Sequence, residues 1–136
     1  MVIHGEWRQV PGASSTALAS LSAIAPQQLP DEYYQLLSHS NGGEGPLPVE
    51  PLYFVLDPAE HAASPTQLSL YQQMAPGMFV IGGNGGGEVI AFDLRSGSAP
   101  WPVVCFDPID PEGSTQLIAE SFKAFVALVG REGGLR

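Results

Sequence analysis

Cysteine and histidine are scarce in this sequence, and their scarcity limits the kinds of site it can build. Cys105 is the only cysteine, so no disulfide can form within the chain and no cysteine cluster can hold zinc. A single thiol is typical of a reducing compartment, and we expect a cytoplasmic location. The three histidines, His4, His39 and His61, lack the spacing of a metal site. The sequence therefore predicts no metal and no cofactor.

Basic residues are also few. Five Lys and Arg stand against 14 Asp and Glu, for a formal net charge of -9. No Lys or Arg lies between Arg8 and Arg95, an interval that holds eight acidic residues: Asp31, Glu32, Glu44, Glu50, Asp57, Glu60, Glu88 and Asp93. A nucleic-acid backbone is bound by clustered basic side chains, so we expect no direct nucleic-acid binding. The acidity either keeps the protein in solution or attracts a basic protein partner.

Long hydrophobic runs are missing as well. No run reaches the roughly 18 to 20 residues that cross a membrane, so we expect no membrane span. The first residues, MVIHGEWRQVPG, lack the basic and apolar regions of a signal peptide. A length of 136 residues with 44% hydrophobic residues is typical of one globular domain. We therefore expect a single domain over residues 1–136, with its core at about 14–130.

Hydrophobic spacing predicts four helices and four strands. The helices are expected at residues 14–25, 30–40, 64–75 and 114–130, and the strands at 51–56, 77–83, 88–94 and 101–107. The last helix should be long, with an apolar stripe formed by Leu117, Ile118, Phe122, Phe125, Val126 and Val129. Short connections between the later strands favour antiparallel pairing. The predicted fold class is α+β, a largely antiparallel sheet with helices packed on it.

The segment GGNGGGEVIAFD, residues 82–93, has five glycines among its first six residues. A phosphate-binding loop leads from a strand into a helix, whereas this cluster leads into an apolar, β-branched strand. Asn84 interrupts the dinucleotide-binding spacing, and Glu88 would repel a phosphate. The segment therefore predicts a hairpin, in which Asn84 and Gly85 supply the positive φ values of a tight turn. Likewise, the run Asn41, Gly42 and Gly43 is expected to close the second helix.

Three blocks of the sequence resemble the SUKH superfamily, which is named for a yeast cell-wall assembly regulator and its bacterial relatives. LPDEYYQLLSHSNGGEG resembles the family's leucine-proline-acidic-tyrosine helix, which ends in Asn-Gly-Gly. FVIGGNGGGEVIAFDL resembles the strand, glycine-rich turn and strand of the second block, and PVVCFD with IAESFKAFVALV resembles the closing strand and helix. The blocks occur in the family's order and span roughly residues 16–130.

The resemblance implies a single-domain α+β protein with a sheet of about four to six strands and no enzymatic activity. Many bacterial members act as immunity proteins that bind and neutralise toxins, often nucleases. Fungal members regulate cell-wall synthesis through protein contacts. The hypothesis is therefore an immunity protein for a basic toxin, and the alternative is a regulatory scaffold that acts through protein contacts with no toxin.

Three residues are candidates for partner binding: Glu44, Glu88 and Trp101. Glu44 follows the Asn-Gly-Gly run, and Glu88 lies at the expected hairpin, where it either accepts backbone hydrogen bonds or faces a partner. Trp101 lies between two prolines and either anchors a partner from an exposed position or packs against the sheet.

Other reactive side chains favour structural roles. Cys105 lies in an apolar strand, where a thiol is usually a small buried hydrophobe rather than a nucleophile. Asp57, Glu60 and His61 are close in sequence, but a solvated turn after a strand explains them better than a metal site. The acids of FDPIDPEG lack the regular spacing of a calcium loop.

Overall fold

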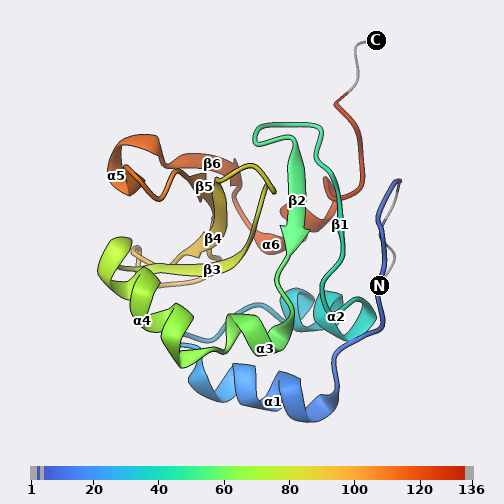
Figure 1. Ribbon diagram of the computed structural model, residues 1–136, viewed down its shortest axis with the longest axis horizontal. Helices are drawn as coiled ribbons and strands as arrows, with labels where there is room; N and C mark the ends of the chain where they lie inside the picture. Colours follow the sequence, from blue (N-terminus) through green and yellow to red (C-terminus); the bar gives the residue numbers. More distant parts are fainter. Residues whose placement is uncertain (1–2, 4, 134–136) are drawn as a thin grey trace.

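The computed structural model describes residues 3 and 5–133. Within them lies one curled, six-stranded sheet whose strands follow one another in chain order (Figure 1). Every neighbouring pair is antiparallel. The strands are β1 (Glu44–Pro46), β2 (Tyr53–Leu56), β3 (Met78–Gly83), β4 (Val89–Asp93), β5 (Val103–Phe106) and β6 (Gln116–Ala119). The predicted α+β class and antiparallel sheet are confirmed.

Six helices occur in this described part of the chain: α1 (Ser15–Ile24), α2 (Asp31–His39), α3 (Ala59–Ala62), α4 (Pro65–Met74), α5 (Pro111–Ser114) and α6 (Phe122–Val126). Helices α1, α2 and α4 confirm the first three predictions. Ser14 begins α1 by accepting the amide of Ala17 at 3.1 Å, and Ser64 precedes the proline at the start of α4. None of the helices in residues 3 and 5–133 has the length and apolar character needed to cross a membrane.

The main core is rich in aromatic rings. Tyr33 of α2 is buried and meets Phe79, Phe92 and Phe122 edge-on, with ring centroids 6.5, 5.5 and 5.7 Å apart. Such pairs add to the stabilisation from buried area. The Tyr33 hydroxyl oxygen is buried and has no hydrogen-bond partner among the described residues. Within the described residues, the core therefore contains a buried hydroxyl, that of Tyr33, without a hydrogen-bond partner.

A second apolar cluster lies on the opposite face of the sheet. It contains Ala75, Met78, Val89, Ala91, Val104 and Phe106, with Tyr71 and Val80 packed against it. Helix α4 contacts β3 (Figure 1), and it supplies Tyr71 to this cluster and Leu68 to the main core. We call the face of the sheet that carries this second cluster the outer face. Strands β4 and β5 are thus buried on both faces, which explains why they read as continuous hydrophobic runs rather than as alternating patterns.

The long C-terminal helix predicted at residues 114–130 is wrong. The segment instead contains the end of α5, then β6, then the short α6. Leu117 pairs with Val104 of β5, and Ser121 begins a new helix by accepting the amide of Ala124 at 3.1 Å. Sheet pairing and a second helix cap override the helical spacing of the apolar residues. Of the predicted stripe, Phe122, Phe125 and Val129 are buried, whereas the Leu117 side chain is 59% exposed.

Candidate functional site

Glu44 lies at the start of β1, at one end of the sheet. It pairs with Val55, which pairs with Gly83, which in turn pairs with Val89 of β4. Residues opposite one another in antiparallel strands share a face, and Val89 belongs to the outer face. The Tyr53 hydroxyl donates to a Glu44 carboxylate oxygen at 2.8 Å. Glu44 is therefore held on the outer face, and it is only partly buried.

Glu88 lies at the hairpin that joins β3 and β4, as the glycine cluster predicted. The Asn84 side-chain oxygen accepts the amides of Gly86 and Glu88 at 2.8 and 3.0 Å. The Asn84 side-chain amide donates to a Glu88 carboxylate oxygen at 3.2 Å. The Glu88 carboxylate is thus oriented by a side chain within the turn.

The turn differs from the prediction in one respect. Positive φ values occur at Gly85 (76°) and Gly87 (106°), whereas Leu52 is the only non-glycine residue with a positive φ in the described ranges. Asn84 therefore does not supply a left-handed backbone, because its role is to accept two backbone amides through its side chain.

Glu44 and Glu88 lie at the same end of the sheet. The row from Glu44 to Val89, the residue after Glu88, crosses three strand spacings, or about 14 Å. Arg8 is the basic residue beside this end, because its backbone amide donates to the Glu44 carbonyl oxygen at 2.8 Å. Glu88 immediately precedes Val89 of the outer face, so a partner that reaches both carboxylates would span this end of the sheet. We call Glu44 and Glu88 the acidic end of the sheet.

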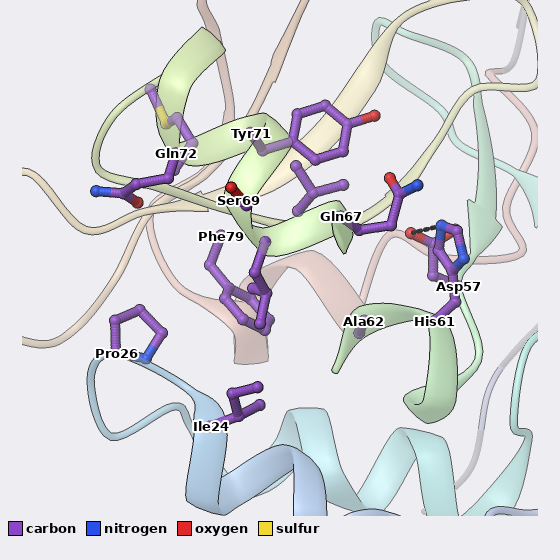
Figure 2. Close-up of a pocket in the computed structure, with 13 residues that line it drawn as sticks. Ile24, Pro26, Asp57, His61, Ala62, Gln67, Ser69, Tyr71, Gln72 and Phe79 are labelled. Carbon is purple, nitrogen blue, oxygen red and sulfur yellow. Dashed lines mark ion pairs between the residues drawn. The ribbon is translucent and has the colours of Figure 1, made fainter. Parts of the chain in front are cut away.

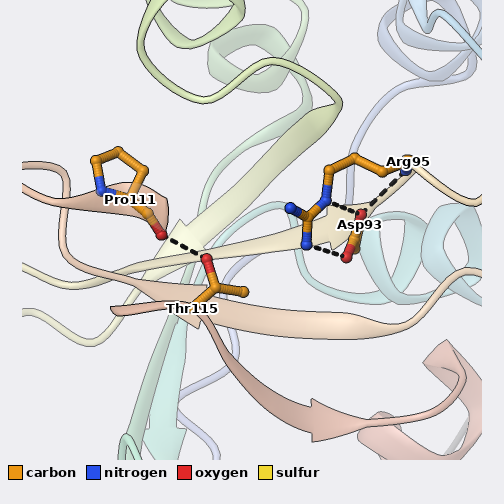
Figure 3. A network of polar contacts seen from close by, with 4 residues as sticks. All are labelled: Asp93, Arg95, Pro111 and Thr115. Atoms are coloured by element: carbon orange, nitrogen blue, oxygen red, sulfur yellow. Dashed lines mark hydrogen bonds and ion pairs between the residues drawn. The ribbon is translucent and has the colours of Figure 1, made fainter. Parts of the chain in front are cut away.

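At the other end of β4, the carboxylate of Asp93 is paired with a basic side chain. The Arg95 guanidinium donates two hydrogen bonds of 2.9 Å to the Asp93 carboxylate (Figure 3). These bonds lower the pKa of Asp93 from its usual value. Nearby, the Thr115 hydroxyl donates to the Pro111 carbonyl oxygen at 2.6 Å and closes α5. Asp93 is therefore neutralised locally, in contrast to the two carboxylates of the acidic end.

The Asn-Gly-Gly run forms a corner after α2. Gly42 and Gly43 have the predicted positive φ values of 118° and 96°. Asn41 has a different role from the predicted helix closure, since its side-chain oxygen accepts the amide of Ala59 at 2.7 Å and its side-chain amide donates to Glu60. Asn41 thus links the end of α2 to the start of α3, and the corner leads directly into β1.

Trp101 is buried, with 3% of its surface exposed, and its indole nitrogen donates to the carbonyl oxygen of Gln28 at 2.9 Å. Of the two alternatives for this residue, the structure shows packing within the core. Trp101 therefore does not lie in the acidic end of the sheet.

The side chain of Cys105 lies in the main core. Cys105 is buried, and burial raises the pKa of its thiol to about 11, which opposes nucleophilic chemistry. Among residues 3 and 5–133, no group of three His, Cys, Asp or Glu side chains is placed to hold a metal ion.

Sequence reasoning missed a pocket beside α4. Its lining includes Asp57 and His61, whose side chains approach to 3.9 Å (Figure 2). The prediction of a solvated turn is wrong for Asp57, because α3 follows it at once and only 24% of its side chain is exposed. The sequence signal for this pocket was the DPAEH segment, which contains Asp57 and His61. The sequence alone does not show that this segment lies against β3, because β3 begins only at Met78, well beyond it in the chain.

Comparison with protein-family models gives a match over most of the chain. The model of the SMI1 / KNR4 family (SUKH-1) matches residues 12–128. This range includes Glu44, Glu88, the Asn-Gly-Gly corner and the glycine-rich hairpin. A search of curated proteins found no match. Because the family model covers nearly all of the sheet and its helices, the chain belongs to the SMI1 / KNR4 family (SUKH-1).

Proposed function

We propose that this protein is a non-enzymatic immunity protein of the cytoplasm, which binds and neutralises a basic toxin domain. Family membership supports a protein-binding role, since domains of this family generally bind partner proteins. An inhibitor acts by covering a site, so it needs complementary shape and charge rather than catalytic groups. The nucleases that immunity proteins of this superfamily often neutralise bind phosphate backbones, which favours a basic surface on the toxin.

The observation that carries the proposal is the pair of carboxylates at the acidic end of the sheet. Glu44 and Glu88 are each held by one neutral donor, Tyr53 and Asn84, rather than by an ion pair within the described residues. The two carboxylates are therefore available to a basic partner. In the part of the chain that the structure describes, the basic side chain that acts near them is Arg8, whose charge affects Tyr53, the donor to Glu44. The net charge of -9 would speed the approach of such a partner.

The test is co-expression with the proteins encoded beside this gene, followed by purification and by a survival assay for any toxic neighbour. We expect a basic toxin domain to co-purify and the wild-type protein to restore growth. The double variant Glu44→Gln/Glu88→Gln should lose protection. Glu112→Gln/Glu120→Gln is the matched control, because it removes two exposed acids elsewhere and changes the net charge equally.

Two results would contradict the proposal. If no neighbouring protein binds, or if the two double variants protect equally well, the acidic end is not the binding surface for a toxin. A stable complex with a non-toxic cellular protein would instead support a regulatory scaffold.

A further inference from the structure

A cavity of about 290 Å³ lies between the end of α1, helices α3 and α4, and the first half of β3 (Figure 2). It forms because β2 leaves the sheet early. The last contact of that segment with β3 is the Asp57 amide, which donates to the Ile81 carbonyl oxygen at 2.9 Å. Met78, Phe79 and Val80 consequently have a neighbouring strand only on the β4 side, and their other side borders the cavity.

The walls of the cavity are mainly apolar. Phe79 and Val80 line it from β3, Ile24 from α1, and Leu68 and Tyr71 from α4. Helix α4 has no fully buried residue, so it covers this part of the sheet loosely. Pockets that hold small organic ligands have volumes of roughly 300–1,000 Å³ and apolar walls with a few polar groups. This cavity is at the lower end of that range and fits a fragment-sized group.

One carboxylate dominates the polar part of the cavity. Asp57 is about three-quarters buried, and within the described residues its side chain accepts no hydrogen bond. The basic side chain that approaches it is the His61 imidazole at 3.9 Å, and no Lys or Arg occurs between Arg8 and Arg95. Burial raises the pKa of Asp57, and its charge contributes to the raised pKa of Tyr71 across the cavity. Burial thus disfavours the ionised form of Asp57, and its pairing with His61 at 3.9 Å is the one ion pair found for it within the described residues.

We propose that this cavity binds an organic cation, namely an apolar group that carries one ammonium or guanidinium. The apolar body would contact Phe79, Val80 and Leu68, and the cation would pair with the Asp57 carboxylate beside the Tyr71 ring. The cation would stabilise the ionised form of Asp57, and the apolar body would remove the exposed walls from water. A free amine and a basic side chain of a protein share this chemistry.

The proposal is tested by NMR titration of the isotope-labelled full chain at pH 8. The probes are 2-phenylethylamine for a free amine and the N-acetyl amides of lysine and arginine for protein side chains. The neutral control ligand is 2-phenylethanol, which has a similar size. We expect at least one cationic probe to shift amide signals at Asp57, His61 and residues 67–72, with 2-phenylethanol about tenfold weaker or more.

Two variants separate the charge from the cavity. Asp57→Asn should weaken binding of the cation about tenfold or more, whereas Glu120→Gln, an exposed acid outside the cavity, should leave it unchanged. Ser69→Phe places a ring at the cavity from an exposed position on α4 and should block binding while the protein stays folded. Binding of the amine but not of the amino-acid amides assigns a free ligand, and the reverse assigns a protein side chain. The proposal is overturned if no cationic probe binds, if the alcohol binds equally well, or if Asp57→Asn binds like wild type.

Discussion

Alanine substitution at three glycines of the cluster tests whether these residues serve the backbone of a hairpin. Gly82, Gly86 and Gly87 are close in sequence but differ in what an added Cβ would meet. At Gly82 the Cβ would overlap the carbonyl oxygen of Val55 in β2. At Gly87 it would meet nothing within 4 Å, but the backbone has a φ of 106°. At Gly86 the nearest atom is the Asn84 side-chain oxygen at 3.6 Å, an ordinary contact, and φ is not positive.

The expected losses of unfolding free energy follow from these differences. Gly82→Ala should cost about 3 kcal/mol or more, because β2 and β3 must separate to admit the methyl group. Gly87→Ala should cost about 1–2 kcal/mol, the penalty for a left-handed conformation in a residue with a Cβ. Gly86→Ala should change stability by less than about 0.5 kcal/mol, since its amide still donates to Asn84.

Urea unfolding followed by circular dichroism measures all three values, and similar m-values would show that the compactness of the two states is unchanged. Equal losses at the three positions, or a loss at Gly86 as large as that at Gly82, would refute the reasoning. In that case the cluster would not act through strand contact and turn geometry.

Three further predictions concern the buried polar groups. Tyr33→Phe removes a hydroxyl that lacks a partner among the described residues, so urea unfolding should show unchanged or higher stability. A loss of unfolding free energy above about 1 kcal/mol would contradict this, because it would mean that the hydroxyl makes a hydrogen bond. Asp57→Asn should be more stable than wild type at pH 7, because burial raises the pKa of Asp57 and so disfavours its ionised form. The difference should vanish as the pH falls below 3.8, where Asp57 is protonated in both the folded and the unfolded state. Thermal unfolding at several pH values that shows a constant difference would contradict this. Cys105 should react with a thiol reagent at pH 8 only after unfolding, because it is buried and its pKa is raised to about 11. Rapid labelling of the folded protein would contradict its burial.

Local signals predicted much of the fold correctly. Ser14 and Ser64 marked the starts of α1 and α4, and the Asn-Gly pair between β-branched runs marked the β3–β4 hairpin. The segment from 114 to 130 could not be assigned in this way. Its apolar residues fit a helical period, but Gln116–Ala119 gain backbone partners from β5, which a reading of one segment alone does not include.

The candidate site shows the same division between local and long-range information. The contact of Asn84 with Glu88 spans four residues, and the glycine cluster pointed to it. The placement of Glu44 and Glu88 at the same end of the sheet depends on the register of three strand pairs. The cavity at Asp57 depends on where β2 leaves the sheet. The burial of Trp101 depends on its contact with Gln28, 73 residues away in the chain.

The most direct test of the acidic end as a binding surface is the dissociation constant of the complex with the partner encoded beside this gene, measured by calorimetry at low and high salt. For the wild-type protein we predict that affinity falls as salt increases, because the salt screens the attraction between Glu44, Glu88 and a basic surface. Glu44→Gln/Glu88→Gln should bind about tenfold more weakly at low salt and respond less to salt. Equal affinity and equal salt dependence for the two proteins would contradict the account.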